Sequence, residues 1–173
     1  GLFTLQSETL SYLSLATGQV IWQQDEIQGL AKVGGKLHYL VRGHHALARG
    51  ILDMDSFQVT QHHILGGEET PGFSAMDYRC LGIDSEGTMI LWKSAGTGED
   101  GFVGLRIISA DNRLEREIPL APSHYRAGYR HQTLALDEEG KCNVVFTAEN
   151  YQNGGTVYYF FRGINIHTGQ VGA

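Results

Sequence analysis

Short runs of apolar, β-branched and aromatic residues recur along the chain, and a glycine precedes each of them. The four glycines are Gly1, Gly35, Gly87 and Gly140. The runs that follow them are Leu2–Leu5, Leu37–Val41, Met89–Trp92 and Cys142–Phe146. Residues of these types favour extended backbone. Each run therefore predicts one β-strand of a repeating unit.

Further short strands are predicted on either side of each run. Preceding strands are expected at Leu30–Val33, Cys80–Ile83 and Thr133–Leu136. Third strands are expected at Leu10–Leu15, Ala46–Leu52, Phe102–Ile108 and Thr156–Ile166, and fourth strands at Val20–Gln23, Gln58–Ile64 and Leu114–Leu120, with a stub at Gln170–Val171. Turns such as Gly34-Gly35 and Asp84–Gly87 join the first strand of a unit to the second. Glycine supplies the positive φ, and aspartate bonds its own backbone, so these segments are hairpin turns.

The repeating unit predicts the fold class. Four-stranded antiparallel meanders that recur about every 40–50 residues are typical of β-propeller blades, and no segment has a helical period. We therefore expect an all-β fold of about four such meanders, forming one propeller segment over residues 1–173. The blades are expected near residues 1–28, 29–65, 79–120 and 132–173. A sandwich or barrel of short strands is the alternative, because alternation and turns alone fit either fold.

The first unit has no predicted inner strand, since that strand would lie before Gly1. An unpaired sheet edge is a liability that closed propellers avoid. The prediction is therefore a segment of a larger propeller, completed by the remainder of the same propeller or by a partner chain. A self-contained ring of four blades is the alternative.

One segment carries a family resemblance. Residues 13–22, Leu-Ser-Leu-Ala-Thr-Gly-Gln-Val-Ile-Trp, resemble the repeat of the PQQ-like (quinoprotein-type) β-propellers, in which an apolar pair, Thr-Gly and Trp mark the last hairpin of a blade. The architecture is also WD40-like. Residues 164–171 are similar but end before the Trp position; the middle units lack Thr-Gly and Trp, and Ser14 stands where the repeat commonly has Asp.

The resemblance implies the fold and no particular chemistry. A quinone-binding dehydrogenase of this type would show many Trp-marked blades and a disc that stacks on the cofactor. This chain has 2 Trp and no adjacent pair of cysteines. We therefore predict no cofactor.

The composition limits the classes of partner that we expect. The net charge is −6, and the 13 Lys and Arg residues are dispersed along the chain, which argues against nucleic acid. No run approaches the roughly 18 apolar residues of a membrane span. Cys80 and Cys142 have no zinc-site spacing and are interpreted as buried thiols. The cellular compartment is not indicated.

The predicted long loops all emerge on one face. In a propeller blade, the connections from second to third strand, and from the fourth strand to the next blade, share one side. Here they are Arg42–His45, Ser94–Gly101, Glu149–Gly155, Leu65–Tyr78 and Ala121–His131. Long connections in a compact domain are disproportionately functional. We expect the functional site on this long-loop face, although tolerated insertions are the alternative for any one loop.

Aromatic residues beside arginine and histidine on this face are the candidate ligand-binding residues. They are Tyr78, Arg79, His124, Tyr125, Arg126, Tyr129, Arg130, His131 and Tyr151. Aromatic rings anchor a partner while polar groups bond its edge. Because Arg79 and Arg130 each precede an inner strand, they are expected at the channel mouth, where they would favour an anionic group. Arginines packed along blade edges are the alternative.

Metal binding and catalysis receive less support. Adjacent histidines, as in His44-His45 and His62-His63, point to opposite sides of a strand, so no metal site is predicted. Loop carboxylates could form a glycosidase-like pair, but their spacing places no two of them together. They are Glu68, Glu69, Asp77, Glu99 and Asp100.

Two functions follow. The favoured one is a binding module that recognises a protein or carbohydrate partner through the long-loop face. The alternative is a propeller enzyme of glycoside hydrolase or lyase type, with acidic loop residues at the channel mouth. An enzyme is the less favoured prediction, because the loops are rich in aromatic residues and show no recognisable catalytic arrangement.

Overall fold

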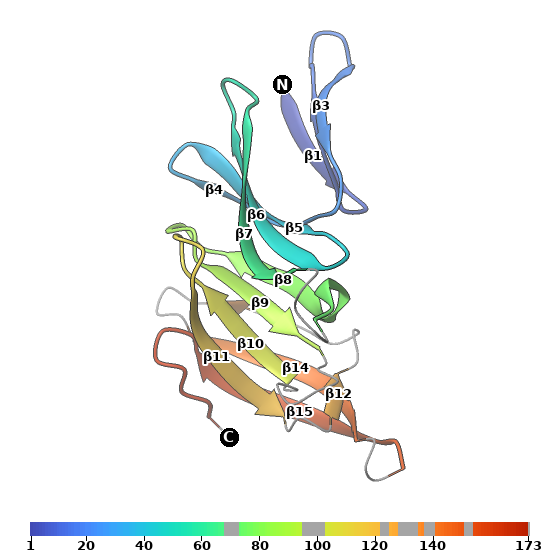
Figure 1. Ribbon diagram of the computed structural model, residues 1–173, viewed down its shortest axis with the longest axis vertical. Helices are drawn as coiled ribbons and strands as arrows, with labels where there is room; N and C mark the ends of the chain where they lie inside the picture. The colour runs from blue at the N-terminus through green and yellow to red at the C-terminus, as the bar shows by residue number, and fades with distance from the viewer. Residues whose placement is uncertain are drawn as a thin grey trace.

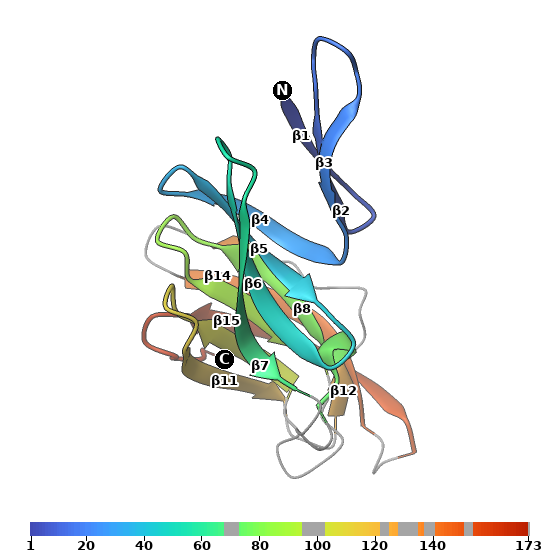
Figure 2. The ribbon, with the colours of Figure 1, turned by 45° about the horizontal axis from the view of Figure 1, so that its top comes forward.

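The protein is a succession of antiparallel β-sheets, shown by a computed structural model in Figures 1 and 2. The structure describes residues 1–67, 73–94, 103–121, 125–127, 135–136, 141–150 and 154–172. Strands dominate these residues, and a single-turn 3₁₀ helix, η1 (Ala75–Asp77), precedes the third sheet. The predicted all-β fold of antiparallel meanders is confirmed, and its arrangement is consistent with part of a propeller. The described residues contain no helix that is long and apolar enough to cross a membrane.

The first two sheets are meanders whose strands pair in sequence order. Sheet A consists of β1 (Leu2–Gln6), β2 (Thr9–Leu13) and β3 (Val20–Gln24). Sheet B consists of β4 (Ile27–Val33), β5 (Lys36–Arg42), β6 (Ala46–Asp53) and β7 (Val59–Gly66). Sheet A therefore has three strands where sheet B has four.

The other two sheets continue the series. Sheet C consists of β8 (Tyr78–Ile83), β9 (Met89–Lys93), β10 (Val103–Ile108) and β11 (Leu114–Ala121). Sheet D consists of β12 (Tyr125–Ala127), β13 (Ala135–Leu136), β14 (Lys141–Asn150) and β15 (Thr156–Asn165). The predicted fourth strand of this unit is represented by one bridge between Ile164 and Val171.

Sheet D departs from the sequence prediction at its first edge. Both β12 and β13 pair with β14, at opposite ends of that long strand: Tyr125 lies opposite Asn150, and Ala135 opposite Asn143. The expected loop at Ala121–His131 therefore contains a strand. The physical reason is that β14 runs to Asn150, past the predicted Cys142–Phe146, and its extra length offers backbone groups with which β12 pairs.

Three apolar layers lie between successive sheets. Between sheets A and B the buried residues include Leu10, Ile27 and Tyr39. The layer between sheets B and C contains Leu40, Leu47, Ile64, Ala75, Tyr78, Met89, Leu91 and Ile108. The layer between sheets C and D contains Ile90, Trp92, Val103, Leu105, Ile107, Ile118, Leu120, Ala121, Ile164 and Ile166.

Strand β9 shows why a strand in the middle of the stack is almost wholly apolar. All five of its residues are buried. Met89 and Leu91 belong to the layer shared with sheet B, whereas Ile90 and Trp92 belong to the layer shared with sheet D. Successive side chains of a strand point to opposite faces. A strand that is covered on both faces therefore reads as an unbroken apolar run.

The stack ends at sheet D with an exposed apolar strip. Val157, Tyr159 and Phe161 alternate along β15 and are 55%, 82% and 57% exposed. The intervening Phe160 packs against the layer shared with sheet C. This face of β15 is therefore open, within the described part of the chain, where sheets B and C have a neighbour on both sides.

The two ends of the strands differ. In Figure 1 the β4–β5, β8–β9 and β10–β11 turns lie on the left, and the β1–β2 turn, the β5–β6 turn and η1 lie on the right. Gly34 and Gly35 have positive φ angles of 53° and 82° in the β4–β5 turn, as expected for a two-residue hairpin. The right-hand end corresponds to the predicted long-loop face.

Candidate functional site

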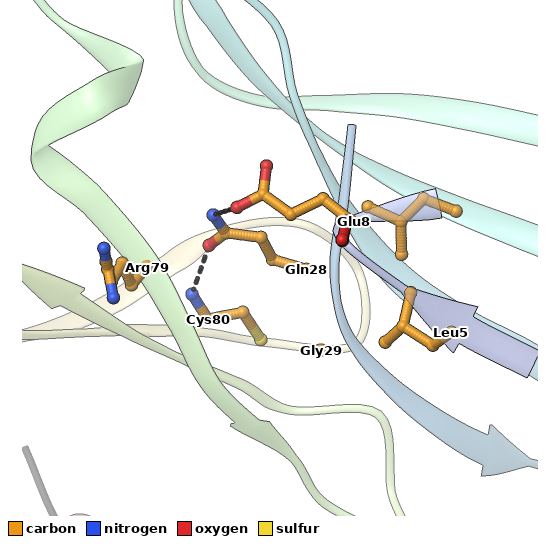
Figure 3. A pocket seen from close by; sticks show the side chains of 8 residues that line it. Leu5, Glu8, Gln28, Gly29, Arg79 and Cys80 are labelled. Carbon is orange, nitrogen blue, oxygen red and sulfur yellow. Dashed lines mark hydrogen bonds between the residues drawn. The ribbon is translucent and has the colours of Figure 1, made fainter. Parts of the chain in front are cut away.

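A hollow of about 410 Å³ lies at the long-loop end, where sheets A, B and C meet. Its walls come from the end of β1 and the turn after it, the start of β4 and the start of β8. The lining residues are Leu5, Ser7, Glu8, Ile27, Gln28, Gly29, Arg79 and Cys80. Figure 3 shows Gln28 and Cys80 between Leu5 on one side and Arg79 on the other. Apolar, polar and charged groups therefore face one space.

The turn between β1 and β2 is built without glycine. Ser7 and Glu8 have φ angles of 49° and 66°, so both lie in the left-handed region that a two-residue hairpin turn requires. Non-glycine residues adopt this region at an energetic cost. The Glu8 carbonyl accepts a hydrogen bond from the N–H of Ile27 at 2.8 Å, which ties the turn to the start of β4. The contacts of Glu8 offset the strained backbone.

The Glu8 carboxylate joins two sheets. Arg42, at the end of β5, donates to both carboxylate oxygens at 3.0 and 2.9 Å. The side-chain amide of Gln28 donates to the same carboxylate at 2.8 Å, and its oxygen accepts the N–H of Cys80 at 3.2 Å. These hydrogen bonds form a row of polar contacts that runs from sheet A through sheet B to sheet C. Figure 3 shows the part of this row formed by Glu8, Gln28 and Cys80. Because Gln28 is held at both ends, its amide is fixed in orientation.

Gly29 allows sheets B and C to approach closely. It has a φ of 62°, and a side chain there would collide with the sulfur of Cys80. Burial raises the pKa of the Cys80 thiol to about 12. The thiolate is the reactive form of cysteine. Cys80 is therefore a neutral packing group at physiological pH, and it gives the hollow no nucleophile.

Arg79 is the predicted site residue that the structure places at the hollow. It is exposed at the start of β8, next to Cys80, whose backbone N–H bonds Gln28. Its position at an inner-strand start is the one expected from the sequence.

Tyr78, its neighbour, lies in the core. It is 2% exposed and stacks on Phe73 with ring centroids 5.4 Å apart. Arg106 donates to the Tyr78 hydroxyl at 2.6 Å. Burial raises the pKa of Tyr78 to about 12, with smaller electrostatic contributions from neighbouring charges. Tyr78 therefore stabilises the interface of sheets B and C and does not face the hollow.

The structure does not place the side chains of the remaining predicted ligand-binding residues. Tyr125 and Arg126 belong to β12, whose backbone is described without its side chains. His124, Tyr129, Arg130, His131 and Tyr151 lie outside the described residues, as do the carboxylates Glu68, Glu69, Glu99 and Asp100. These predictions stay predictions.

Sequence reasoning did not identify Glu8, Gln28 and Arg42. Two weak signals were present. Gln28 is a polar residue two positions before the predicted inner strand Leu30–Val33, and Ser7-Glu8 is a hairpin turn that lacks the glycine or asparagine such turns prefer. Neither signal specifies that residues 20 and 34 positions apart would meet.

The structure also describes the two pairs of adjacent histidines. The rings of His44 and His45 lie 6.4 Å apart at the β5–β6 turn, and His62 and His63 are exposed on β7. In the part of the chain that the structure describes, no three His, Cys, Asp or Glu side chains gather as a metal site.

Comparisons with known proteins add no family assignment. Neither the protein-family models nor the curated proteins contain a match to this chain.

Proposed function

We propose that the protein is a binding module, built of successive propeller blades, that recognises a polypeptide at the hollow where sheets A, B and C meet. The observation that carries this proposal is the row of hydrogen-bonded polar groups that joins sheets A, B and C at the hollow. Ligand sites combine apolar walls with a few oriented polar groups. Here Leu5 and Ile27 are apolar, and Gln28 is oriented by its bonds to Glu8 and Cys80.

Arg79 supplies the charged contact of the proposed site. It is exposed and lines the hollow. The carboxylate of Glu8 accepts hydrogen bonds from Arg42 and Gln28. A guanidinium forms paired hydrogen bonds with carboxylates. The expected ligand is therefore a polypeptide with an acidic side chain close to an apolar stretch.

The chemistry of the hollow supports binding over catalysis. The Cys80 thiol is neutral at physiological pH, and the Glu8 carboxylate forms an ion pair with Arg42. A glycan would also use oriented amides and carboxylates, but the wall formed by β1 is the edge of a sheet, which suits a polypeptide backbone.

The test is selection from a random peptide library displayed on phage, followed by affinity measurement with purified protein. Peptides enriched on the native chain should lose binding at least about tenfold when Arg79→Glu removes the cation. The matched control is Arg113→Glu, because the Arg113 side chain is 83% exposed in the β10–β11 turn at the opposite end. No enrichment, binding indifferent to Arg79→Glu, or enrichment on a glycan array in place of the peptide library would overturn the proposal.

A further inference from the structure

A positively charged side chain is enclosed between sheets B and C, at the tight-turn end opposite the hollow. Arg49, on β6, is fully buried, and its guanidinium donates to the Ser109 carbonyl at 2.8 Å, to the Asn112 side chain at 2.6 Å and to the Gly87 carbonyl. These acceptors belong to the β8–β9 turn and the β10–β11 region, which lie together on the left in Figure 1. Nη1 of Arg49 also lies 3.4 Å from Nδ1 of His38, on the neighbouring strand β5.

The contact between Arg49 and His38 depends on the protonation state of the histidine ring. A guanidinium has donors only and stays protonated in proteins, so Nδ1 of His38 can accept from it only when the ring is neutral and carries its proton on Nε2. A proton on Nδ1 would place a second positive charge 3.4 Å from a fully buried guanidinium. Like charges repel strongly where water is excluded. Protonation of His38 therefore turns an attractive contact into a repulsive one.

The surroundings favour the neutral ring. Burial lowers the pKa of His38 from its ordinary value, and the positive charges of Arg49 and Lys36 lower it further. The residue opposite His38 on β4 is Ala31, which carries no charge. The titratable and charged groups on the other elements around the pair are Lys36 on β5, Asp53 on β6, His62 on β7, Cys80 on β8, Asp84 and Glu86 in the β8–β9 turn, and Asp111 and Arg113 in the β10–β11 turn.

The nearby carboxylates are held within their own turns. Asp84 accepts two backbone N–H groups of the β8–β9 turn at 2.9 and 2.8 Å. Asp111 accepts the Ser109 hydroxyl and forms an ion pair with Arg113 at 3.2 Å. Among the described hydrogen bonds and ion pairs, none joins His38 to a carboxylate. A proton on His38 is therefore not compensated by a carboxylate in the packed arrangement.

We propose that the His38–Arg49 pair is an acid-sensitive joint between sheets B and C. At neutral pH the unprotonated ring helps to hold the guanidinium against the carbonyl groups of Gly87 and Ser109. When His38 takes up a proton, repulsion displaces Arg49, and the β8–β9 and β10–β11 turns separate from β6. The apolar layer that contains Leu40 and Leu47 stays packed, so the opening is confined to the tight-turn end. The joint goes beyond the proposed function and does not depend on it.

Proton linkage gives the direction and the pH range of the opening. The pKa of the ring is lower in the closed joint than its ordinary value of about 6.5, so the closed joint binds fewer protons than the open one in mild acid. The closed joint is therefore fully stable above about pH 6.5 and weakens as the pH falls toward the lowered pKa. Over that range the ratio of closed to open joint falls by up to about tenfold per pH unit.

NMR on the full chain tests the joint directly. At about pH 7.5 the ¹⁵N shifts of the His38 ring should show a proton on Nε2 and none on Nδ1. The Nε–H of Arg49, which is bonded to Asn112, should be protected from hydrogen exchange at the same pH. Between about pH 6.5 and 5.5 this protection, corrected for the intrinsic pH dependence of exchange, should fall by about three- to tenfold.

Three variants assign the acid response to one ring. His38→Gln retains an acceptor for Arg49 but takes up no proton, so the protection of Arg49 should no longer fall in acid. The matched control is His63→Gln, because His63 is exposed and lies on the other face of β7 from the residue opposite Arg49. His62→Gln removes the exposed histidine that does lie opposite Arg49. Both of these variants should keep the acid-dependent loss of protection.

Every outcome bears on the joint. A loss of protection that persists in His38→Gln, or that disappears in His62→Gln, would overturn the assignment to His38. A proton on Nδ1 at neutral pH would show that the ring does not accept from Arg49. The unmodified chain decides the matter even if a variant fails to fold. If His38 becomes protonated while the protection of Arg49 stays constant, the pair is not an acid-sensitive joint.

Discussion

Sheets A and C are built from the same antiparallel meander, yet they differ in burial. Every residue of β9 in sheet C is buried, whereas none of the residues of β1 in sheet A is. The strands are similar in composition: β9 reads Met-Ile-Leu-Trp-Lys and β1 reads Leu-Phe-Thr-Leu-Gln. The difference lies in the neighbours, because sheet C is covered on both faces and sheet A on one. Position in the stack decides whether such a strand is buried or stays exposed.

This contrast implies a gradient of stability along the molecule. Local stability follows buried apolar contact and protected backbone hydrogen bonds. Sheet C has both. In the part of the chain that the structure describes, sheet A has an unpaired edge at β1 and an open face that exposes Leu2 and Val20. The proposed binding site, at the hollow beside sheet A, therefore lies at the less stable end.

The two tryptophans provide the largest test of this contrast. Trp92 in sheet C is fully buried, and Trp22 in sheet A is partly buried. Trp92→Ala should lower the free energy of unfolding by about 3–5 kcal/mol, because it opens a cavity between two sheets. Trp22→Ala should cost about half as much or less. Urea unfolding followed by circular dichroism measures both, and equal losses would show that the two sheets do not differ in stability.

Arg49 tests the link between sheets B and C. It is fully buried, and it donates to the Asn112 side chain at 2.6 Å, to the Ser109 carbonyl at 2.8 Å and to the Gly87 carbonyl. Arg49→Ala should cost about 2–4 kcal/mol, since three acceptors in the turns of sheet C lose their partner. Arg113→Ala is the exposed control and should stay within about 0.5 kcal/mol. A cost for Arg49→Ala no larger than that of its control would contradict the assigned role.

A substitution at Gly29 tests how closely β4 packs on β8 at the hollow. Gly29→Ala should cost about 1–3 kcal/mol, from left-handed backbone and from collision with Cys80. Gly18→Ala is matched in backbone, with a φ of 70°, but no atom lies within 4 Å of the place that its methyl group would take. The excess loss at Gly29 in thermal unfolding measures the packing of β4 on β8. No excess would mean that this contact is loose.

The smallest expected effect is an alkaline loss of stability that originates in the interior layers. Burial raises the pKa of Tyr39, Tyr78 and Cys80 to about 12. The unfolded chain loses these protons near the ordinary values, while the folded chain keeps them. Stability is therefore full below about pH 8 and falls as pH rises toward 12, first through the cysteine and then through the tyrosines.

Between about pH 9 and 10.5 the melting temperature should drop by a few degrees. Replacing Tyr39 and Tyr78 with phenylalanine should reduce the slope. A melting temperature that stays flat over this interval would contradict the burial of these ionisable groups.

Much of the fold was predictable, because hairpin turns and alternating apolar strands are local signals. The Gly34-Gly35 turn and the strands around it lie where they were expected. Strand β12 was not predicted, since its pairing depends on the length of β14, a partner more than ten residues away in sequence.

The candidate site was predictable only in part. Arg79 followed from its place before an inner strand. The row from Arg42 through Glu8 and Gln28 to Cys80 joins residues 34, 20 and 52 positions apart. Such contacts depend on how sheets stack, which the local pattern does not specify. For the same reason Tyr78, next to Arg79, could be taken for a surface residue although it lies in the core.

A map of NMR chemical-shift changes, recorded on the full chain as the selected peptide binds, shows directly whether the hollow beside sheet A is the binding surface. The largest changes are expected at the amides of Phe3, Leu5, Ser7, Gln28 and Arg79. A cluster instead on the exposed strip of β15, at Val157, Tyr159 and Phe161, or at the tight turns of sheets B and C, would contradict it.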